Sequence, residues 1–386
     1  MSPRKPVIAL VAGEASGDQL GAALVEQLRQ RHPQARFVGI GGKRMQEAGV
    51  DAWWDAQELA VMGLFEVLAH FPRLLKIRRE LRRRLLALQP DVYVGIDAPD
   101  FNLGLEIKLR RAGIRTVHYV SPTVWAWRKK RVRKIGRAAD LVLCLFPFEP
   151  GFYEGHGVAA SYVGHPMADQ IDADTDPAGA RVSLGLAPEA TTIALLPGSR
   201  VNEVSRLAEP MIEAVRLLRV RRPGLQFVAA SASEPVGAIF RQAMRDLGCE
   251  EITLVPNRPR QVMAAGDVVL CASGTATLET MLVNRPLVMV YRIAASTFWL
   301  VKNLRVIKRQ LFALPNILAG EALVPELVQD EATGERMAAE IERWLDDPGL
   351  RGKLRHRFNE LHSELRCEAS ERAANAVSGF LDSGAG

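Results

Sequence analysis

Short apolar segments that alternate with helical segments constrain the fold of this chain most. Residues 7–11 (VIALV) form a continuous apolar run, which is typical of a strand buried on both faces of a parallel sheet. The run ends at the turn-forming segment 13–18, after which leucines recur at helical spacing at positions 20, 24 and 28. Further strands are predicted at 91–96, 116–120 and 141–145. This alternation predicts a doubly wound parallel sheet.

The same pattern begins again near residue 190. A buried strand is predicted at 192–196, a break at 197–200, a helix to about residue 222, and strands at 226–230, 252–255, 268–271 and 287–290. The segment 172–179 between the halves is acidic and turn-prone, as linkers are. We therefore expect an α/β chain of two Rossmann-like domains facing across a cleft, with C-terminal helices packed across them. The expected bounds are 1–172, a linker at 173–180, 181–355, and a helical segment at 356–386.

Composition and charge exclude several classes of protein. Of the 386 residues, 48% are hydrophobic and 24% charged, which excludes a disordered chain. The four cysteines are scattered without metal-ligand spacing, as in a reduced cytosolic protein. No stretch without Asp, Glu, Lys or Arg exceeds 14 residues, so we expect no membrane-spanning helix. The net charge of +6 lies entirely in residues 1–175, which favours an anionic partner: nucleic acid, lipid head groups or a phosphorylated substrate.

Two loops of the second half are suited to a diphosphate. Residues 196–200 (LPGSR) join a strand to a helix with a glycine, a hydroxyl and the guanidinium of Arg200, which can bind two phosphate oxygens at once. In 271–279 (CASGTATLE), small residues open a helix, and Glu279 follows where it could accept hydrogen bonds from ribose hydroxyls. The alternatives are a plain glycine turn with Arg200 on the surface, and a Ser-capped helix packed on the sheet.

Two loops of the first half carry carboxylates at strand ends. They are 13–18 (GEASGD) and 95–102 (GIDAPDFN). A carboxylate in the second loop could take a proton from a substrate hydroxyl, and Asp97, closer to the strand, is the better base than Asp100. The alternative is that Asp97 or Asp100 caps the following helix.

Three segments are strongly basic. Residues 73–88 have the pattern of a basic amphipathic helix, and 128–137 contain seven cations. Residues 280–320 contain no acid and six Lys or Arg. Within them, bulky apolar side chains alternate with cations, which suits contact with a membrane surface, at Phe298, Trp299, Leu300, Lys302 and Arg305. RNA binding and a solvated helix face are the alternatives.

Five segments together resemble the lipid-A-disaccharide synthase family. They are 11–18, 95–102, 119–128 (YVSPTVWAWR), 196–200 and 273–279, in the family's order, and the similarity runs over essentially the whole chain. The first three are specific to that family, and the last two are shared more loosely with other sugar-nucleotide enzymes of the same fold.

This resemblance implies a GT-B-like glycosyltransferase that needs neither metal nor cofactor. The family joins UDP-2,3-diacylglucosamine to 2,3-diacylglucosamine 1-phosphate (lipid X), with release of UDP and formation of a β-1,6 disaccharide. The reaction inverts at the anomeric carbon, so it needs a base on the acceptor hydroxyl and stabilisation of the departing diphosphate. The resemblance also implies a cytoplasmic protein at the inner-membrane surface, with no nucleic-acid partner and a homodimer formed through the C-terminal segment.

The resemblance further implies roles for individual residues. Asp97 would be the base, and Arg200 would take part in catalysis by stabilising the diphosphate. The donor contacts would be Gly198, Ser199, Arg200, Ser273, Gly274, Thr275, Glu279 and Asn316. The acceptor contacts would be Glu14, Ser16, Gly17, Asp18 and Asp100.

Two other functions stay open on the sequence alone. A UDP-sugar 2-epimerase or another transferase of the same fold would share the diphosphate loops but not the membrane surface. A non-catalytic lipid- or RNA-binding protein would not bind UDP.

Overall fold

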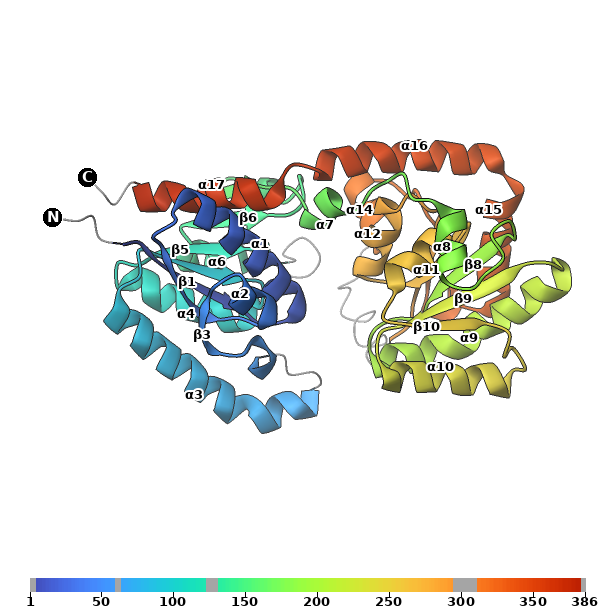
Figure 1. Cartoon of the computed structure of the whole chain (residues 1–386), viewed down its shortest axis with the longest axis horizontal. Coiled ribbons are helices and arrows are strands. Elements are labelled where there is room, and N and C mark those ends of the chain that lie inside the picture. The colour runs from blue at the N-terminus through green and yellow to red at the C-terminus, as the bar shows by residue number, and fades with distance from the viewer. Residues whose placement is uncertain (1–4, 60–63, 123–130, 294–310, 383–386) are drawn as a thin grey trace. The chain divides into compact units, whose positions relative to one another are not determined.

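The computed structural model describes residues 5–59, 64–122, 131–293 and 311–382 (Figure 1). The chain divides into two compact units. The first consists of Met1–Asp169 together with Leu365–Gly386, and the second of Gln170–Glu364. The domain bounds expected from the sequence remain predictions.

The first unit is built on a seven-stranded parallel sheet with the order β3-β2-β1-β4-β5-β6-β7. The four predicted strands are present as β1, β4, β5 and β6, and three further strands, β2, β3 and β7, join them. The strands are β1 (Val7–Ala12), β2 (Arg36–Ile40), β3 (Asp51–Trp54), β4 (Val92–Ile96), β5 (Arg115–Tyr119), β6 (Leu141–Cys144) and β7 (Ala160–Tyr162). The doubly wound sheet predicted for the first half is therefore confirmed.

Helices cover this sheet, and the last one comes from the C-terminus of the chain. Helix α17 packs against α1, and Ala373, Ala374 and Val377 lie in the same buried core as β1 (Figure 1). The C-terminal helix thus completes the first unit. The helices are α1 (Ala15–Arg31), α2 (Lys43–Glu47), α3 (Leu64–Leu88), α4 (Pro99–Arg111), α6 (Arg131–Ala138), α7 (Pro166–Gln170) and α17 (Ala369–Asp382), with short 3-10 turns at Ala56–Glu58 and Pro150–Phe152.

The second unit has a six-stranded parallel sheet with the order β10-β9-β8-β11-β12-β13. Its strands are β8 (Thr192–Leu196), β9 (Gln226–Ser231), β10 (Thr253–Pro256), β11 (Val268–Ala272), β12 (Leu287–Tyr291) and β13 (Glu326–Val328). Its helices are α8 (Pro177–Ser183), α9 (Val201–Arg221), α10 (Glu234–Asp246), α11 (Pro259–Ala265), α12 (Thr275–Leu282), α14 (Leu314–Ala319), α15 (Gly334–Asp346) and α16 (Pro348–Leu365), with a 3-10 turn at Gln329–Glu331. Helix α8 begins inside the segment expected as a linker, because Pro177 is pre-organised for the first position of a helix.

Each sheet reverses its strand order once. In the first sheet β1 lies between β2 and β4, and in the second β8 lies between β9 and β11. In sheets of this kind ligands bind beyond the carboxyl ends of the strands, at the point of reversal. The loops after β1 and β4, and those after β8 and β11, are therefore where binding residues are expected.

Stability of the first unit is linked to the protonation of His165. This side chain is buried, its Nδ1 accepts a 3.2 Å hydrogen bond from the Met167 amide, and its own amide donates to the Leu365 carbonyl. Burial lowers the pKa of His165 from 6.5 to about 4. The unfolded chain takes up a proton near pH 6.5, whereas the folded chain does so only near pH 4, so stability is complete above pH 6.5 and falls as the pH drops from 6.5 to 4.

We expect the His165→Asn variant to lose this pH dependence, because asparagine keeps an acceptor for the Met167 amide but does not titrate. In the wild type, the free energy of unfolding should fall by about 3 kcal/mol between pH 6.5 and 4 from this group alone. Urea unfolding across this range measures the difference. An identical slope in both proteins would show that His165 is not the titrating group.

Candidate functional site

The loops after β1 and β4 meet at the carboxyl edge of the first sheet. A Cβ atom at Gly13 would lie only 2.6 Å from the Cβ of Ala98, so glycine is what allows the two loops to approach. Together with α3 they form a pocket of about 390 Å³. Three carboxylates and one guanidinium line it among apolar side chains: Glu14, Leu59, Leu74, Leu75, Arg78, Asp97, Ala98, Pro99, Asp100 and Phe101.

Asp97 is held at the end of β4 by an unusual backbone. Asp97 and the next residue, Ala98, both have positive φ angles, 50° and 44°. Such conformations cost on the order of 1–3 kcal/mol each and persist only where the surroundings enforce them. Buried Asn102 does so, because its Nδ2 donates a 2.8 Å hydrogen bond to the Asp97 carbonyl while its Oδ1 accepts one from the Tyr93 hydroxyl.

The alternative role of these two aspartates as helix caps is not what the structure shows. The N-cap of α4 is Ala98, and no side chain caps it. Asp97 is half-buried, Asp100 lies exposed in the first turn of α4, and both line the pocket.

The acceptor residues predicted in the first loop fall into two groups. Glu14 and Ser16 are exposed, and Glu14 lines the pocket. Gly17 and Asp18 are buried, and the Asp18 carboxylate accepts hydrogen bonds from the amides of Gly42, Arg44 and Met45 at 2.7–3.1 Å. Asp18 therefore fixes the start of α2.

In the second unit, the loops after β8 and β11 form a pocket of about 360 Å³. Gly198 and Gly274 have φ angles of 119° and 129°, which favour glycine and leave the backbone open. A Cβ at Gly198 would overlap the Glu203 carboxylate, which accepts a 3.1 Å hydrogen bond from the Ser199 amide. The predicted residues found in the lining are Gly198, Ser199, Arg200, Ser273, Gly274, Thr275 and Glu279.

The sequence left two alternatives for these loops: a glycine turn with Arg200 on the surface, and a helix capped by a serine. Arg200 is exposed, but it lines the pocket and stands at the N-cap position of α9. The N-cap of α12 is Gly274, without a side-chain cap, so Ser273 does not cap that helix. The first backbone N–H groups of α12 and the Arg200 side chain therefore belong to the same pocket, which is an arrangement suited to a diphosphate.

Two predicted donor residues already have partners within the protein. Glu279 accepts a 3.1 Å hydrogen bond from Arg260 through Oε2, and it lines the pocket. Asn316 is fully buried, and its amide bonds to the Val324 carbonyl and the Glu326 carboxylate. The described residues that line the pocket do not include Asn316.

Sequence reasoning missed several residues of these pockets. Leu59, Leu74, Leu75, Arg78 and Phe101 line the first, and Ser231, Pro259 and Met263 the second. The helical pattern over 73–88 was visible in the sequence, but it does not tell which of its cations faces a loop. The sequence also did not show that Glu203 lines the second pocket, because its carboxylate reaches Gly198 and the Ser199 amide only in the folded loop.

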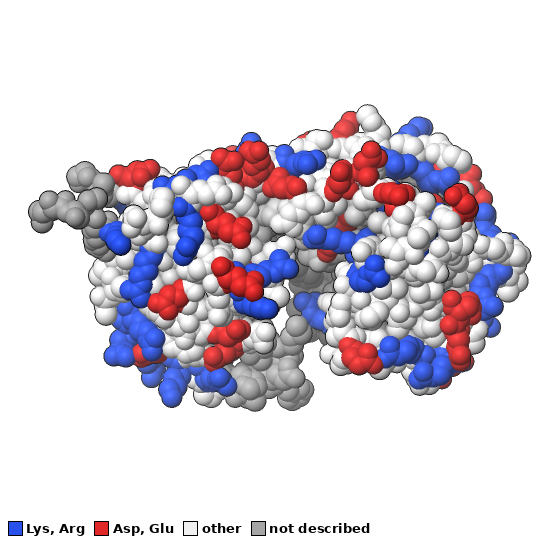
Figure 2. All heavy atoms as spheres, in the orientation of Figure 1, with Lys and Arg blue, Asp and Glu red and all other residues white. Residues whose placement is uncertain are grey.

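Of the basic segments, only the one at 73–88 lies fully within the described residues. It is helical, as predicted, within the longer α3, and Ile77, Leu81 and Leu85 pack into the core. Its cations cover the outer face, where blue spheres gather over α3 (Figure 2). The predicted membrane contacts Phe298, Trp299, Leu300, Lys302 and Arg305 lie outside the described residues. Across the described ranges, no helix is both long and apolar enough to cross a bilayer.

Comparisons with known proteins agree with this architecture. A family model described as lipid-A-disaccharide synthetase matches residues 8–377. A lipid-A-disaccharide synthase from Xanthomonas axonopodis pv. citri (strain 306) is 52% identical over 380 residues, which cover 98% of this chain and 87% of that protein. One from Xylella fastidiosa (strain M12) is 50% identical over 378 residues, covering 97% and 98% of the two chains.

Solved structures share the fold at low sequence identity. A putative UDP-N-acetylglucosamine 2-epimerase from Listeria monocytogenes has a TM-score of 0.63 at 14% identity and covers 96% of this chain and 94% of its own. The UDP-GlcNAc 2-epimerase from Neisseria meningitidis bound to UDP-GlcNAc has a TM-score of 0.61 at 11% identity and covers 97% and 99%. This likeness shows a fold of two Rossmann-like domains, the GT-B type.

If the second pocket binds a diphosphate through Arg200, we expect Arg200→Lys to weaken UDP binding about tenfold. A lysine is a point charge and cannot make the two-pronged contact that arginine makes with phosphate oxygens. Calorimetry with UDP and with uridine measures the effect, and only UDP binding should change. The control is Arg216→Lys, an exposed arginine on the same helix outside the pocket. Equal UDP affinity in both variants would remove Arg200 from the diphosphate site.

Proposed function

The chain belongs to the lipid-A-disaccharide synthase family, and on that premise we propose how its residues carry out the family's reaction. The enzyme condenses UDP-2,3-diacylglucosamine with lipid X to give the β-1,6-linked disaccharide 1-phosphate and UDP. The observation that carries this function is the identity of 50–52% with lipid-A-disaccharide synthases over nearly the whole chain.

The pocket of the first unit is the proposed acceptor site. Lipid X carries acyl chains, a 1-phosphate and a reacting 6-hydroxyl, and the pocket offers a chemical partner for each. Leu59, Leu74, Leu75 and Phe101 provide apolar surface for the acyl chains, and Arg78 provides a guanidinium for the phosphate. Glu14, Asp100 and the exposed Ser16 beside Gly17 add groups that can accept or donate hydrogen bonds to the sugar.

Asp97 is the proposed general base. The acceptor 6-hydroxyl gives its proton to the Asp97 carboxylate while its oxygen forms a bond to the anomeric carbon of the donor. The bond between that carbon and the diphosphate oxygen breaks on the opposite side, so an α-linked donor gives a β-linked product. The enforced backbone at Asp97 and Ala98 fixes where this carboxylate lies, so little reorganisation is needed at the moment of reaction.

The pocket of the second unit is the proposed donor site. Negative charge grows on the departing diphosphate, and Arg200 with the N–H groups at the start of α12 stabilises it. Glu279 has a second carboxylate oxygen for ribose hydroxyls while Oε2 holds Arg260. Asn316 acts indirectly, because it orders the segment at 323–326, and the neighbouring Leu314 amide donates a 3.1 Å hydrogen bond to Thr277 of α12.

Incubation of the purified chain with both acylated substrates tests the function itself. UDP release is followed by chromatography and the disaccharide by mass spectrometry, and the two should form in equal amounts. UDP release without disaccharide would instead indicate hydrolysis of the donor. Epimerised donor without disaccharide would indicate the activity named for the Neisseria meningitidis structure.

We expect Asp97→Asn to lower turnover at least about 10²-fold, because the amide cannot accept the proton, while UDP affinity stays unchanged. Single-turnover kinetics with saturating substrates measures the chemical step. Asp100→Asn is the matched control on the same loop: as a proposed acceptor contact it should raise the KM for lipid X, but it should leave the chemical step at saturation nearly unchanged. Near-normal turnover of Asp97→Asn would move the role of base to Asp100 or Glu14.

Peripheral association with the cytoplasmic face of the inner membrane is part of the proposal. Both substrates are lipids, and α3 carries its cations beside the acceptor pocket, since Leu75 and Arg78 line that pocket as well as a smaller basic groove with Arg79, Arg82 and Lys108. Cations near anionic lipid contribute on the order of 1 kcal/mol each. The membrane contacts predicted at 298–305 are the second proposed part of this membrane-binding surface.

A homodimer through the C-terminal segment is the remaining part of the proposal. Helix α17 packs on α1 through a small apolar face and the Arg31–Glu371 ion pair of 2.9 Å. Exchange of this segment between two copies would remake the same contacts at little cost.

The double variant Lys76→Gln/Arg79→Gln should bind vesicles of phosphatidylglycerol about tenfold more weakly than the wild type at low salt, because both side chains are exposed on α3. The difference should shrink at high salt, where charges are screened. Co-sedimentation measures it, and Arg216→Gln/Lys353→Gln removes the same charge from the second unit as a control. Equal binding of both double variants would place the membrane surface elsewhere, with 298–305 as the next candidate.

A further inference from the structure

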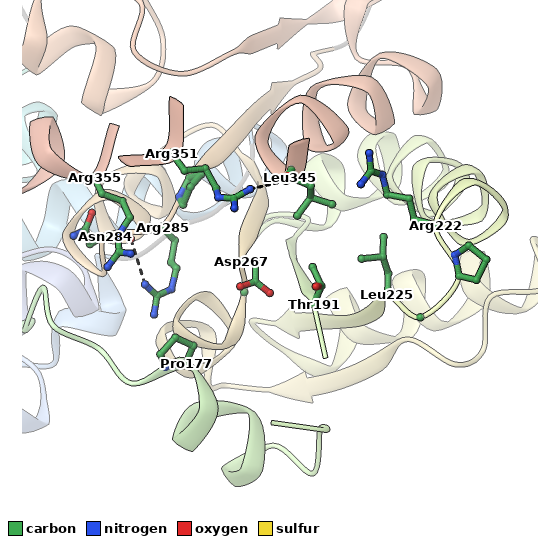
Figure 3. Close-up of a pocket in the computed structure, with 14 residues that line it drawn as sticks. Pro177, Thr191, Arg222, Leu225, Asp267, Asn284, Arg285, Leu345, Arg351 and Arg355 are labelled. Atoms are coloured by element: carbon green, nitrogen blue, oxygen red, sulfur yellow. Dashed lines mark hydrogen bonds between the residues drawn. The ribbon is translucent and has the colours of Figure 1, made fainter. Parts of the chain in front are cut away.

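The second unit contains another cavity, at the opposite edge of its sheet from the nucleotide pocket. Its volume is about 480 Å³. Figure 3 shows the residues that line it. Thr191, Leu225, Asp267 and Pro286 line it, and each immediately precedes a strand: β8, β9, β11 and β12. Because the strands are parallel, this cavity lies at their amino ends, whereas the donor loops follow their carboxyl ends.

Four arginines line this cavity, and three of them lack an acidic partner. Arg222 pairs with Asp346 and Glu342, and the only acid in the described lining, Asp267, pairs with Arg181 at 2.7 Å. In the described part of the chain, Arg285, Arg351 and Arg355 make no ion pair with a carboxylate, although Figure 3 shows them from neighbouring elements of one wall. The cavity is therefore positively charged.

Arg285 is the most deeply buried of these three arginines, with only 5% of its surface exposed. Its guanidinium donates to neutral oxygens only: the Ala264 and Asn284 carbonyls at 3.2 and 3.3 Å, and the carbonyl and hydroxyl of Thr175 at 3.2 and 3.0 Å. Burial, and then the like charge of Arg355, lower the pKa of Arg285 to about 10, so it remains charged at neutral pH. The carboxylates of Asp267 and Asp176 act on Arg285 only at a distance and do not offset this lowering. A buried cation without a directly paired carboxylate is unfavourable, and a bound anion would compensate it.

The wall beside Arg285 also contains an unused acceptor. Asn284 is 3% exposed, and its Nδ2 donates a 2.8 Å hydrogen bond to Asn359. Its Oδ1 is buried and has no hydrogen-bond partner. Buried polar atoms normally have one, so this oxygen is suited to a ligand that brings a hydroxyl.

We propose that this cavity is a second anion site that binds a phosphate group. Arg285 and Arg355 would each donate to phosphate oxygens, with Arg351 adding charge from α16, and a protonated oxygen or an adjacent hydroxyl would donate to Asn284 Oδ1. The ligand class is a phosphate monoester or phosphodiester with a hydroxyl. Such a group can come from a soluble metabolite or from the head group of a phospholipid such as phosphatidylglycerol.

The test uses the whole enzyme with its nucleotide pocket saturated by UDP, so that phosphate cannot report on that pocket. Equilibrium dialysis with radiolabelled inorganic phosphate measures the remaining uptake. Arg355→Gln should weaken it about tenfold or more, because a charge-assisted contact is lost. Lys353→Gln, an exposed cation two residues away on α16 and outside the cavity lining, should bind like the wild type. Arg285→Lys keeps the charge, but a lysine cannot hold the Ala264, Asn284 and Thr175 oxygens and also donate to phosphate, so it should weaken uptake too.

Vesicles distinguish the two sources of phosphate. If UDP-saturated wild type takes up no inorganic phosphate but binds phosphatidylglycerol vesicles more tightly than Arg355→Gln does, the site takes a lipid head group. Arg355 is exposed, so its variant should keep the wild-type circular dichroism. The proposal is overturned if neither probe distinguishes Arg355→Gln from Lys353→Gln.

Discussion

The reversal of strand order in each sheet is the constraint on which both proposed sites depend. Where β1 neighbours both β2 and β4, the helices that follow β1 and β4 pack on opposite faces of the sheet, so a crevice opens where the loops after these strands meet. The same holds for β8 and β11 in the second unit. Both pockets lie at these loops. The loop after β1 contains Gly13, which permits a close approach to Ala98, and the loop after β8 contains Gly198, which has a positive φ angle.

A buried polar network supports the first of these sites. Tyr93 from β4 and Asn102 from α4 are hydrogen-bonded to each other, and Asn102 holds the Asp97 carbonyl. Next to them, fully buried Glu106 and His118 are joined by a 2.8 Å hydrogen bond. Burial, together with the Glu106 carboxylate, raises the pKa of Tyr93, so this hydroxyl remains a donor. The left-handed backbone at Asp97 thus rests on groups that water does not reach.

Much of the fold could be predicted from the sequence, because central strands such as β1 and β8 are continuous apolar runs. The strands that were missed are β2 and three peripheral ones, β3, β7 and β13. The peripheral strands have three or four residues each and are only partly buried, so they leave no such run. The loops of both sites could be located from their glycines and polar residues at strand ends. The roles of single residues could not always be predicted, because they depend on contacts between segments that are distant in the sequence. The residues around Asp18 do not show that its carboxylate binds the start of α2, and those around Asn316 do not show that its side chain is buried.

In the proposed mechanism, Asp97 removes the proton from the acceptor hydroxyl. The most direct measurement is a structure of Asp97→Asn enzyme with UDP-2,3-diacylglucosamine and lipid X bound, since this variant should trap both substrates. We expect the 6-hydroxyl oxygen of lipid X to lie within about 3 Å of the side chain at position 97, in line with the anomeric carbon of the donor. A 6-hydroxyl directed at Asp100 or Glu14, with the side chain at position 97 out of hydrogen-bonding reach, would contradict it.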